Sequence, residues 1–266
     1  MKVAVIGAGV IGGAVVKSLL NSDGIERVIA TRRKLDRLKP LEDMGAKVTD
    51  DNVSAAGEAD VVFICVKPGD VGNVVKEIKG KIAGKLVVST AAIIPIKFFK
   101  SVAPDARFVR SMPNVAALVG ESFTAFSCDE DITEDDRKLV KRLLSTMGPC
   151  EEVEEKYMDA VTGLSGSGPA YVAIVIESMM YAGLKVGLPR EFSLYSSAQA
   201  VLGAAKLMLD GGFSASAIKD MVTTPGGTTI EGIYQLEDGK IRTALMKAVE
   251  AATEKGASIS FNWNNN

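Results

Sequence analysis

Residues 2–12 read KVAVIGAGVIG, and this stretch decides the fold of the first half of the chain. The β-branched run Lys2–Ile6 predicts a buried strand. Gly7, Gly9 and Gly12 follow it directly and open a segment with helical periodicity. Between a strand and a helix, glycines at this spacing permit a tight turn and let a pyrophosphate approach the helix N-terminus. The stretch therefore predicts a dinucleotide-binding site; the alternative is a glycine-rich helix start that binds nothing.

The same rhythm of strands and helices continues beyond this stretch. Further β-branched runs predict strands at Arg27–Ala30, Asp60–Val66, Lys85–Ser89, Arg107–Arg110 and Phe123–Ser127. Segments of helical length separate most of them, which is typical of βαβ units in a parallel sheet that helices cover on both faces. An amphipathic helix is predicted at residues 133–147.

The predicted secondary structure changes after this helix. From about Glu154 onward nearly every segment has helical character, with the longest helices predicted at residues 171–186, 191–209 and 240–257. The polar tail, residues 262–266, is expected to fray. We therefore expect an α/β, Rossmann-type dinucleotide-binding domain at residues 1–152, followed by an all-α domain at residues 153–266. A length of 266 residues agrees with two domains.

Composition limits the kind of protein. Hydrophobic residues make up 47% and charged residues 24%, and the net charge of -2 gives no basic footprint for nucleic acid, so no nucleic-acid partner is expected. No run of about 18 apolar residues occurs, and the apolar start lacks the features of a signal peptide, so no membrane partner is expected. The 3 cysteines form no CxxC pair, which favours a reducing, cytoplasmic setting. The absence of histidine excludes imidazole catalysis and His-containing metal sites, and we expect no metal.

The end of the second predicted strand bears on the choice of cofactor. A fold that selects NAD places a carboxylate there for the ribose hydroxyls, whereas an arginine can hold a 2′-phosphate. Here Arg32, Arg33 and Lys34 follow the strand, and no carboxylate stands among them. The sequence favours NADPH and leaves the use of NADH open; a solvated basic loop is the alternative.

The residues that follow two later predicted strands are also expected to lie near the cofactor. Residues at the carboxyl ends of parallel strands line the ligand crevice of such a sheet. Val66-Lys67-Pro68 ends one predicted strand, which gives Lys67 a place on the cofactor side, although a merely solvated lysine is the alternative. Ser89-Thr90-Ala91-Ala92 ends the next strand and offers small residues where a nicotinamide ring would need room.

Six motifs in order make the chain resemble the pyrroline-5-carboxylate reductases: GAGVIG, VKP, STAA, RSMPN at 110–114, GLSGSGPAY at 163–171 and TTPGGTTI at 223–230. The likeness covers nearly the whole chain, and the last two motifs are its most specific parts. It implies reduction of the cyclic imine 1-pyrroline-5-carboxylate to L-proline with NADPH or NADH, the last step of proline biosynthesis. Asn52 matches the family only through its place ahead of a strand. The implied cofactor contacts are Gly9, Val10, Ile11, Arg32, Arg33, Asn52, Val66, Lys67, Pro68, Ala91 and Ala92.

The stretch TTPGGTTI also has a physical interpretation beside the family one. The substrate is an anion, and a helix N-terminus offers unpaired N–H groups and partial positive charge. Gly226 and Gly227 would let a carboxylate reach the backbone with no Cβ in the way. The expected substrate contacts are Thr224, Gly226, Gly227, Thr228 and Thr229; by resemblance, Thr229 faces the ring nitrogen as the catalytic residue. The alternative is a plain helix start with a threonine N-cap.

Three other classes of protein share some of these features. A β-hydroxyacid dehydrogenase has the same domain order and a GxxGxG helix start, but places a catalytic lysine four residues past the last glycine, where this chain has Val172. Another NADP-dependent imine reductase would share the cofactor and the reaction type. A non-catalytic NADP-binding protein would explain the first half of the chain and leave TTPGGTTI without a role.

The predicted helices of the second half also bear on association. Residues 171–180 and 197–209 contain more apolar and small residues than one buried stripe needs, so another surface must cover them. We expect a homodimer through these helices, as in the family that the chain resembles, with a higher multiple of dimers left open. A single compact bundle is the alternative.

Overall fold

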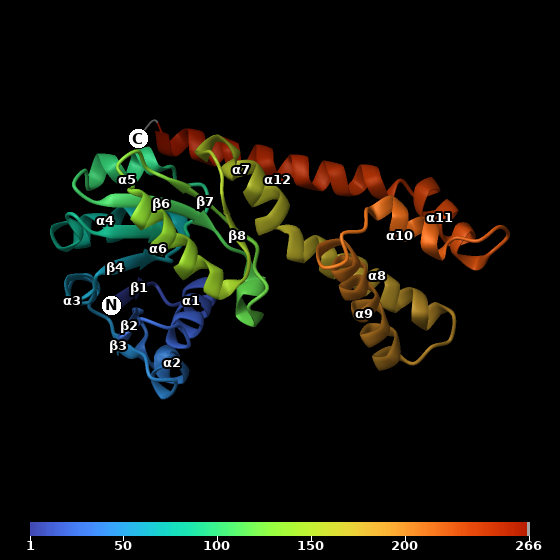
Figure 1. Cartoon of the computed structure of the whole chain (residues 1–266), viewed down its shortest axis with the longest axis horizontal. Coiled ribbons are helices and arrows are strands. Elements are labelled where there is room, and N and C mark those ends of the chain that lie inside the picture. Colours follow the sequence, from blue (N-terminus) through green and yellow to red (C-terminus); the bar gives the residue numbers. More distant parts are fainter. Residues whose placement is uncertain (265–266) are drawn as a thin grey trace. The chain divides into compact units, whose positions relative to one another are not determined.

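The computed structural model describes the backbone of residues 1–264 and the side chains of residues 1–259. The described chain forms two compact units (Figure 1). Unit 1 comprises residues 1–167 together with the chain from Val249 onward, and unit 2 comprises Gly168–Ala248. Of the predicted tail, residues 262–264 continue the last helix, and residues 265–266 lie outside the described residues.

Unit 1 contains one eight-stranded sheet with the order β3-β2-β1-β4-β5-β6-β7-β8. Neighbouring strands run parallel from β3 to β6, β7 runs antiparallel to β6, and β8 runs parallel to β7. The strands are β1 Lys2–Ile6, β2 Arg27–Thr31, β3 Lys47–Thr49, β4 Val61–Ile64, β5 Leu86–Ser89, β6 Arg107–Met112, β7 Thr124–Cys128 and β8 Cys150–Glu152.

The alternation of side chains along each strand builds two cores. Val3 and Val5 of β1 belong to a buried cluster with α1 and α6, whereas Ala4 and Ile6 belong to a cluster with α3, α4 and α5. Helices therefore cover both faces, which explains the continuous apolar runs of the strands. The helices are α1 Val10–Leu20, α2 Lys39–Asp43, α3 Asn52–Glu58, α4 Pro68–Ile82, α5 Ile96–Val102, α6 Glu134–Leu144 and α7 Met158–Val161.

The predicted strands are all present, with ends shifted by at most two residues, but two short strands were not predicted. β3 and β8 have three residues each and show no local strand pattern. β3 is stabilised by pairing with β2, and β8 by pairing with β7. The antiparallel direction of β7 also departs from the expected parallel sheet. The α/β Rossmann-type class of the first half is confirmed.

The compact units divide after Ser167, whereas the sequence placed the boundary between residues 152 and 153. The intervening segment is helical, as predicted, but it contacts the sheet unit. Arg110 of β6 donates a hydrogen bond to Asp159, and the amide of Asn114 donates one to the carbonyl of Ser165. These contacts join residues about 50 positions apart and cannot be found from local periodicity. The segment contains the short helical turns η4 Glu155–Tyr157, α7 and the π-helical turn η5 Thr162–Gly166.

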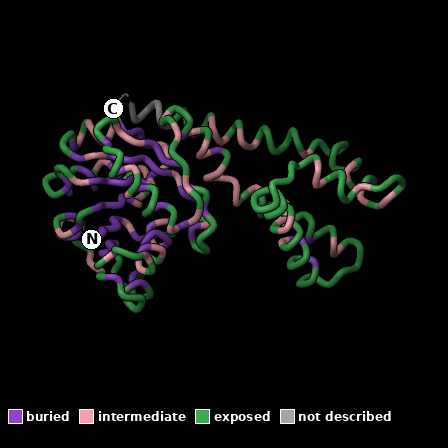
Figure 2. Tube along the Cα trace, in the orientation of Figure 1, coloured by how far each residue is buried: buried purple, intermediate pink, exposed green. Residues whose placement is uncertain are grey.

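Unit 2 is all helical and has little interior of its own. Figure 2 shows its surface as almost entirely exposed or half-buried, and Met180, Ser193 and Ser197 are its buried residues among those described. α8 and α9 approach closely, because a Cβ on Gly183 would lie 2.4 Å from the Ser193 hydroxyl oxygen. The helices are α8 Gly168–Lys185, α9 Arg190–Leu209, α10 Ala215–Val222, α11 Thr228–Asp238 and α12 Ile241–Asn264, the last continuing into unit 1. Through Asn264, no helix is both long and apolar enough to cross a membrane.

Candidate active site

The three glycines after β1 differ in what a side chain at each position would meet. Gly7 has φ of 93°, which favours glycine, and a Cβ there would lie 2.5 Å from Cγ1 of Val66. A Cβ on Gly12 would lie 2.4 Å from the carbonyl oxygen of Gly7 and 3.0 Å from Cβ of Cys65. A Cβ on Gly9, in contrast, would meet no atom within 4 Å. Gly7 and Gly12 are thus required by the fold, whereas Gly9 leaves open space beside the backbone.

The N-terminus of α1 is open to a ligand. Gly9 is the N-cap residue, and no side chain of the described residues caps the helix. Val10 is 62% exposed, and Ile11 is half-buried. The first N–H groups of a helix have no partner within the helix, and their partial positive charge attracts anions. This turn can therefore hold a pyrophosphate on backbone N–H groups, as the sequence predicts.

Asn52 lies beside this turn, although 40 or more residues separate the two in sequence. The hydroxyl of Thr31, at the end of β2, accepts from the N–H of Gly7 (3.3 Å) and donates to Oδ1 of Asn52 (2.6 Å). The amide nitrogen of Asn52 donates to Glu77 of α4 (3.0 Å). Sequence reasoning missed Thr31, whose signal was a polar residue at the end of a buried strand.

The two arginines after β2 differ in their surroundings. Arg32 is half-buried, and its guanidinium lies 3.4 Å from the carbonyl oxygen of Ala8 in the glycine turn. The side chain of Arg33 is 90% exposed, and its guanidinium lies 3.5 Å from Asp70 in the first turn of α4. Both arginines thus follow the strand that lies next to β1, and Arg32 contacts the turn itself.

The segments after β4 and β5 lie at the same edge of the sheet, because Ile6 pairs with Ile64 and Ile64 pairs with Ser89. Val66 packs against Gly7, and the exposed Lys67 is the N-cap residue of α4, which begins at Pro68. These positions agree with the expected crevice residues.

The small residues after β5 form a tight turn. Ala91 is buried, Ala92 is half-buried, and the N–H of Ala91 donates to the hydroxyl of Ser89 (3.2 Å). Burial raises the pKa of the Cys65 thiol to about 12, an effect that a hydrogen bond with Thr90 reduces. Cys65 therefore stays a neutral thiol at physiological pH and offers no nucleophile here.

The TTPGGTTI segment forms the connection from α10 to α11 in unit 2. Gly226 has φ of 69°, a backbone conformation that favours glycine. A Cβ on Gly227 would lie 2.4 Å from the hydroxyl oxygen of Thr224, so glycine is favoured there because of the close contact. Gly227, not a threonine, is the N-cap residue, and no described side chain caps α11. Thr228 is exposed and Thr229 half-buried in the first turn. The alternative of a threonine N-cap is therefore wrong for this helix.

The motifs RSMPN and GLSGSGPAY meet within unit 1. The amide of the buried Asn114 donates to the carbonyl of Ser165 (3.1 Å), and a Cβ on Gly166 would lie 2.6 Å from Cε of Met112. The N–H of Ser167 donates to the carbonyl of Thr162 (3.0 Å), five residues earlier, which closes the π-helical turn. Gly166 thus allows close packing against Met112, and the motif contains a widened helical turn.

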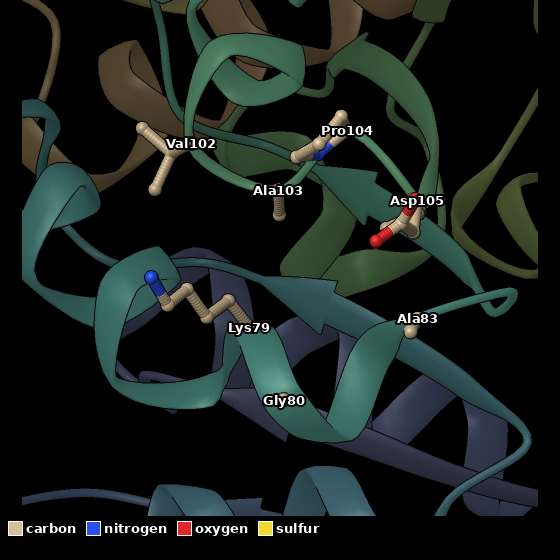
Figure 3. Close-up of a pocket in the computed structure, with 8 residues that line it drawn as sticks. Lys79, Gly80, Ala83, Val102, Ala103, Pro104 and Asp105 are labelled. Carbon is tan, nitrogen blue, oxygen red and sulfur yellow. The ribbon is translucent and has the colours of Figure 1, made fainter.

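A surface cavity of about 320 Å³ lies elsewhere in unit 1 (Figure 3). The end of α4 contributes Lys79 and Ala83, and the connection from α5 to β6 contributes Pro104 and Asp105. These residues lie near the amino ends of β5 and β6, so the cavity is separate from the crevice at the carboxyl ends. Among the residues that the structure describes, no group of three or more Cys, Asp or Glu side chains is placed to hold a metal ion.

A glycine turn at the switch from β1 to β4, an open helix N-terminus and flanking arginines define a nicotinamide-dinucleotide-dependent oxidoreductase. Residues 2–93 match the family described as NADP oxidoreductase, coenzyme F420-dependent, and residues 155–259 match the family described as pyrroline-5-carboxylate reductase dimerisation. The chain belongs to the pyrroline-5-carboxylate reductase family.

Two relatives and one solved structure illustrate the likeness. The pyrroline-5-carboxylate reductase of Arabidopsis thaliana is 39% identical over 97% of this chain and 95% of its own length. That of Methanosarcina acetivorans is 38% identical over 97% of both chains. The NADP-bound crystal structure of Plasmodium falciparum pyrroline carboxylate reductase superimposes with a TM-score of 0.90, covers 98% of each chain and is 29% identical. This membership speaks against a β-hydroxyacid dehydrogenase, in agreement with Val172 in place of the catalytic lysine.

The different surroundings of the glycines predict separable effects of substitution. Gly9→Ala should fold with nearly unchanged stability, because its Cβ meets nothing, but should weaken NADPH binding by about tenfold or more if phosphate oxygens occupy that space. Gly12→Ala should instead lower the melting temperature. Gly13→Ala, whose Cβ also meets nothing, is the control and should leave NADPH affinity unchanged. Fluorescence titration and thermal melting measure both effects; unchanged affinity in Gly9→Ala would contradict the pyrophosphate assignment.

Proposed function

We propose that this chain reduces 1-pyrroline-5-carboxylate to L-proline with NADPH as the last step of proline biosynthesis, in the cytoplasm. The observation that carries the proposal is likeness over 97% of the chain to enzymes named for this reaction. The open N-terminus of α11 supports it, because the site it forms suits an anion. The direct test is oxidation of NADPH and NADH by the purified protein in the presence of pyrroline-5-carboxylate, with proline identified as the product.

The substrate carboxylate is placed at the start of α11 in this proposal. The N–H groups of the first turn face no capping side chain among the described residues, and a Cβ on Gly226 would meet no atom within 4 Å, which leaves the backbone there open to an anion. Thr224 and Thr228, both exposed, add hydroxyl donors beside this backbone. The half-buried Thr229 sits in the same turn, with its hydroxyl assigned to the ring nitrogen.

The reaction suits a site without a strong acid. A protonated imine already carries the positive charge that draws a hydride to its carbon, so the chain needs no histidine or carboxylic acid of the kind a ketone would require. The nicotinamide supplies the hydride when the cofactor is bound. The Thr229 hydroxyl can accept from the protonated nitrogen and donate to the amine that forms, so it holds the ring in place while the charge on the nitrogen changes. Orientation then provides most of the acceleration.

A preference for NADPH rests on Arg32 and Arg33. Changing both to Ser removes two cations that follow β2, so the KM for NADPH should rise by about tenfold or more, while the KM for NADH changes little. Steady-state kinetics with both cofactors measures this split. Lys34→Ser, which removes a neighbouring exposed cation, is the matched control for a general loss of positive charge. Equal effects of the double change on the two cofactors would contradict a phosphate clamp.

Thr229→Val separates a chemical role from a packing role, because it keeps the size and branching of the side chain and deletes the hydroxyl. Loss of a hydrogen bond to a charged group typically costs about 1.5 to 3 kcal/mol, so kcat should fall by about ten- to a hundredfold, with folding and NADPH affinity preserved. Thr223→Val is the matched control: it lies in the same segment, and its hydroxyl donates to the carbonyl of Lys219 (2.6 Å). A Thr229→Val protein that turns over normally would overturn the assignment.

Association through unit 2 is also proposed. Its surface exposes many large apolar side chains, among them Ile174 at 62%, Tyr195 at 74% and Leu209 at 83%. The match of residues 155–259 to a dimerisation family supports a second copy as the cover. Sedimentation of the protein should give a dimer or a multiple of dimers, and Ile174→Glu should shift it toward monomers, because a buried unpaired charge is unfavourable. A stable and active wild-type monomer would contradict the proposal.

A further inference from the structure

Arg110 is a buried cation that the proposed reaction does not use. It lies in β6 opposite Ser89 of β5, at the carboxyl ends of the strands, and its side chain is 4% exposed. A guanidinium out of water is unfavourable unless carboxylates and hydrogen bonds compensate it. Its partners therefore indicate what this charge holds together.

Two carboxylates from one short segment meet this guanidinium. Asp159 of α7 accepts a hydrogen bond from it (2.7 Å), and Glu155 of η4 lies 3.6 Å from its other terminal nitrogen. The same Glu155 oxygen accepts from the backbone N–H of Ile96 (2.7 Å), the first residue of α5. The ion network thus fixes the start of α5 to β6 and to the segment before the π-helical turn.

The loop from Thr90 to Pro95 connects β5 to α5, and this network holds one end of it. At its other end the N–H of Thr90 donates to the carbonyl of Ile64 (2.9 Å). Within it, Ile93 has φ of 66°, one of two positive values among the non-glycine residues that the structure describes. This backbone conformation is unfavourable for a β-branched side chain and persists only where the surroundings impose it.

α12 brings the strained residue and the ion network together. Gly256 is buried, and a Cβ there would lie 3.8 Å from both Cγ2 of Ile93 and Cβ of Asp159. Ile93 and Asp159 therefore border the same small surface of α12. Through Glu155 the network thus binds Ile96, the residue directly after the loop, and it borders Ile93 beside Gly256.

We propose that Arg110 is a positioning residue which, through Glu155 and Asp159, keeps the loop of residues 90–95 in the shape that receives the nicotinamide end of the cofactor. This inference rests on the proposed function, in which Ala91 and Ala92 of this loop are cofactor contacts. In this role Arg110 acts through its two carboxylate partners, and it holds Ile93 in its left-handed conformation.

The first test compares NADPH with 2′-phospho-ADP-ribose, a fragment that lacks the nicotinamide. Arg110→Met removes the charge and keeps much of the side-chain length. It should raise the Kd for NADPH by about tenfold and leave the Kd for the fragment unchanged, because only the nicotinamide end meets the loop. Arg110→Lys should recover part of the loss. The proposal would be overturned if Arg110→Met raised the Kd for both ligands equally, or if it changed neither Kd.

A control on the same strand separates positioning from stability. Arg107 begins β6, and its guanidinium pairs with Asp136 of α6. Arg107→Met should lower the melting temperature without changing the affinity for NADPH. If Arg110→Met does not fold, Glu155→Ala serves instead, because it removes the acceptor for the Ile96 N–H and the 3.6 Å ion pair with Arg110 but leaves the pair of Arg110 and Asp159. It should raise the Kd for NADPH several-fold; an unchanged Kd would overturn the proposal.

The strained residue allows a rescue experiment. Glycine adopts φ near 66° without steric cost, so Ile93→Gly in the Arg110→Met background should restore NADPH affinity by several-fold. Lys240→Gly is the matched control, because Lys240 is the other described non-glycine residue with positive φ (55°) and should give no rescue. Simple additivity of Arg110→Met and Ile93→Gly would overturn the role given to Ile93. A wild-type protein that binds NADPH but does not reduce pyrroline-5-carboxylate would refute the proposed function alone, since the binding tests need no turnover.

Discussion

The close approach of the glycine turn to the end of β4 is the constraint on which the cofactor crevice depends. Side chains on Gly7 or Gly12 would overlap Val66 or the turn's own carbonyl, so α1 could not begin where it does. Once α1 begins there, its unpaired N–H groups face the edge where β1, β2, β4 and β5 all end. The position of this uncapped helix N-terminus is thus a consequence of two missing Cβ atoms. Gly9 adds open space rather than packing.

The hydrogen bonds around this edge connect segments that are distant in sequence. Thr31 links the turn to Asn52, and Asn52 links it to Glu77, so β2, α3 and α4 all fix the geometry beside the glycine turn. Arg110 and its carboxylates fix the other side of the crevice in a similar way. The first connection uses neutral groups and one exposed carboxylate, whereas the second buries charge. The unfavourable burial of charge in the second is consistent with a need for one defined loop conformation.

Unit 2 differs from unit 1 in how it is stabilised. Its helices bury few side chains within the unit and expose many large apolar ones, so its stability cannot come from an interior of its own. Glycines fix the local backbone at two places in this unit. Gly183 allows α8 and α9 to approach each other, and Gly226 and Gly227 shape the start of α11. Both features agree with a unit whose apolar surface is completed by association.

The sequence by itself determined the βαβ rhythm, the glycine turn after Lys2–Ile6 and the helical second half, because these depend on local periodicity and on glycine. The family likeness also followed from short motifs. Only the tertiary structure decided the pairing of β3 and β8, the direction of β7, the attachment of residues 153–167 to the sheet unit and the contacts of Asn52. It alone revealed the burial of Arg110 and the strained backbone of Ile93. Each of these depends on residues far apart in the chain, and no local pattern encodes such contacts.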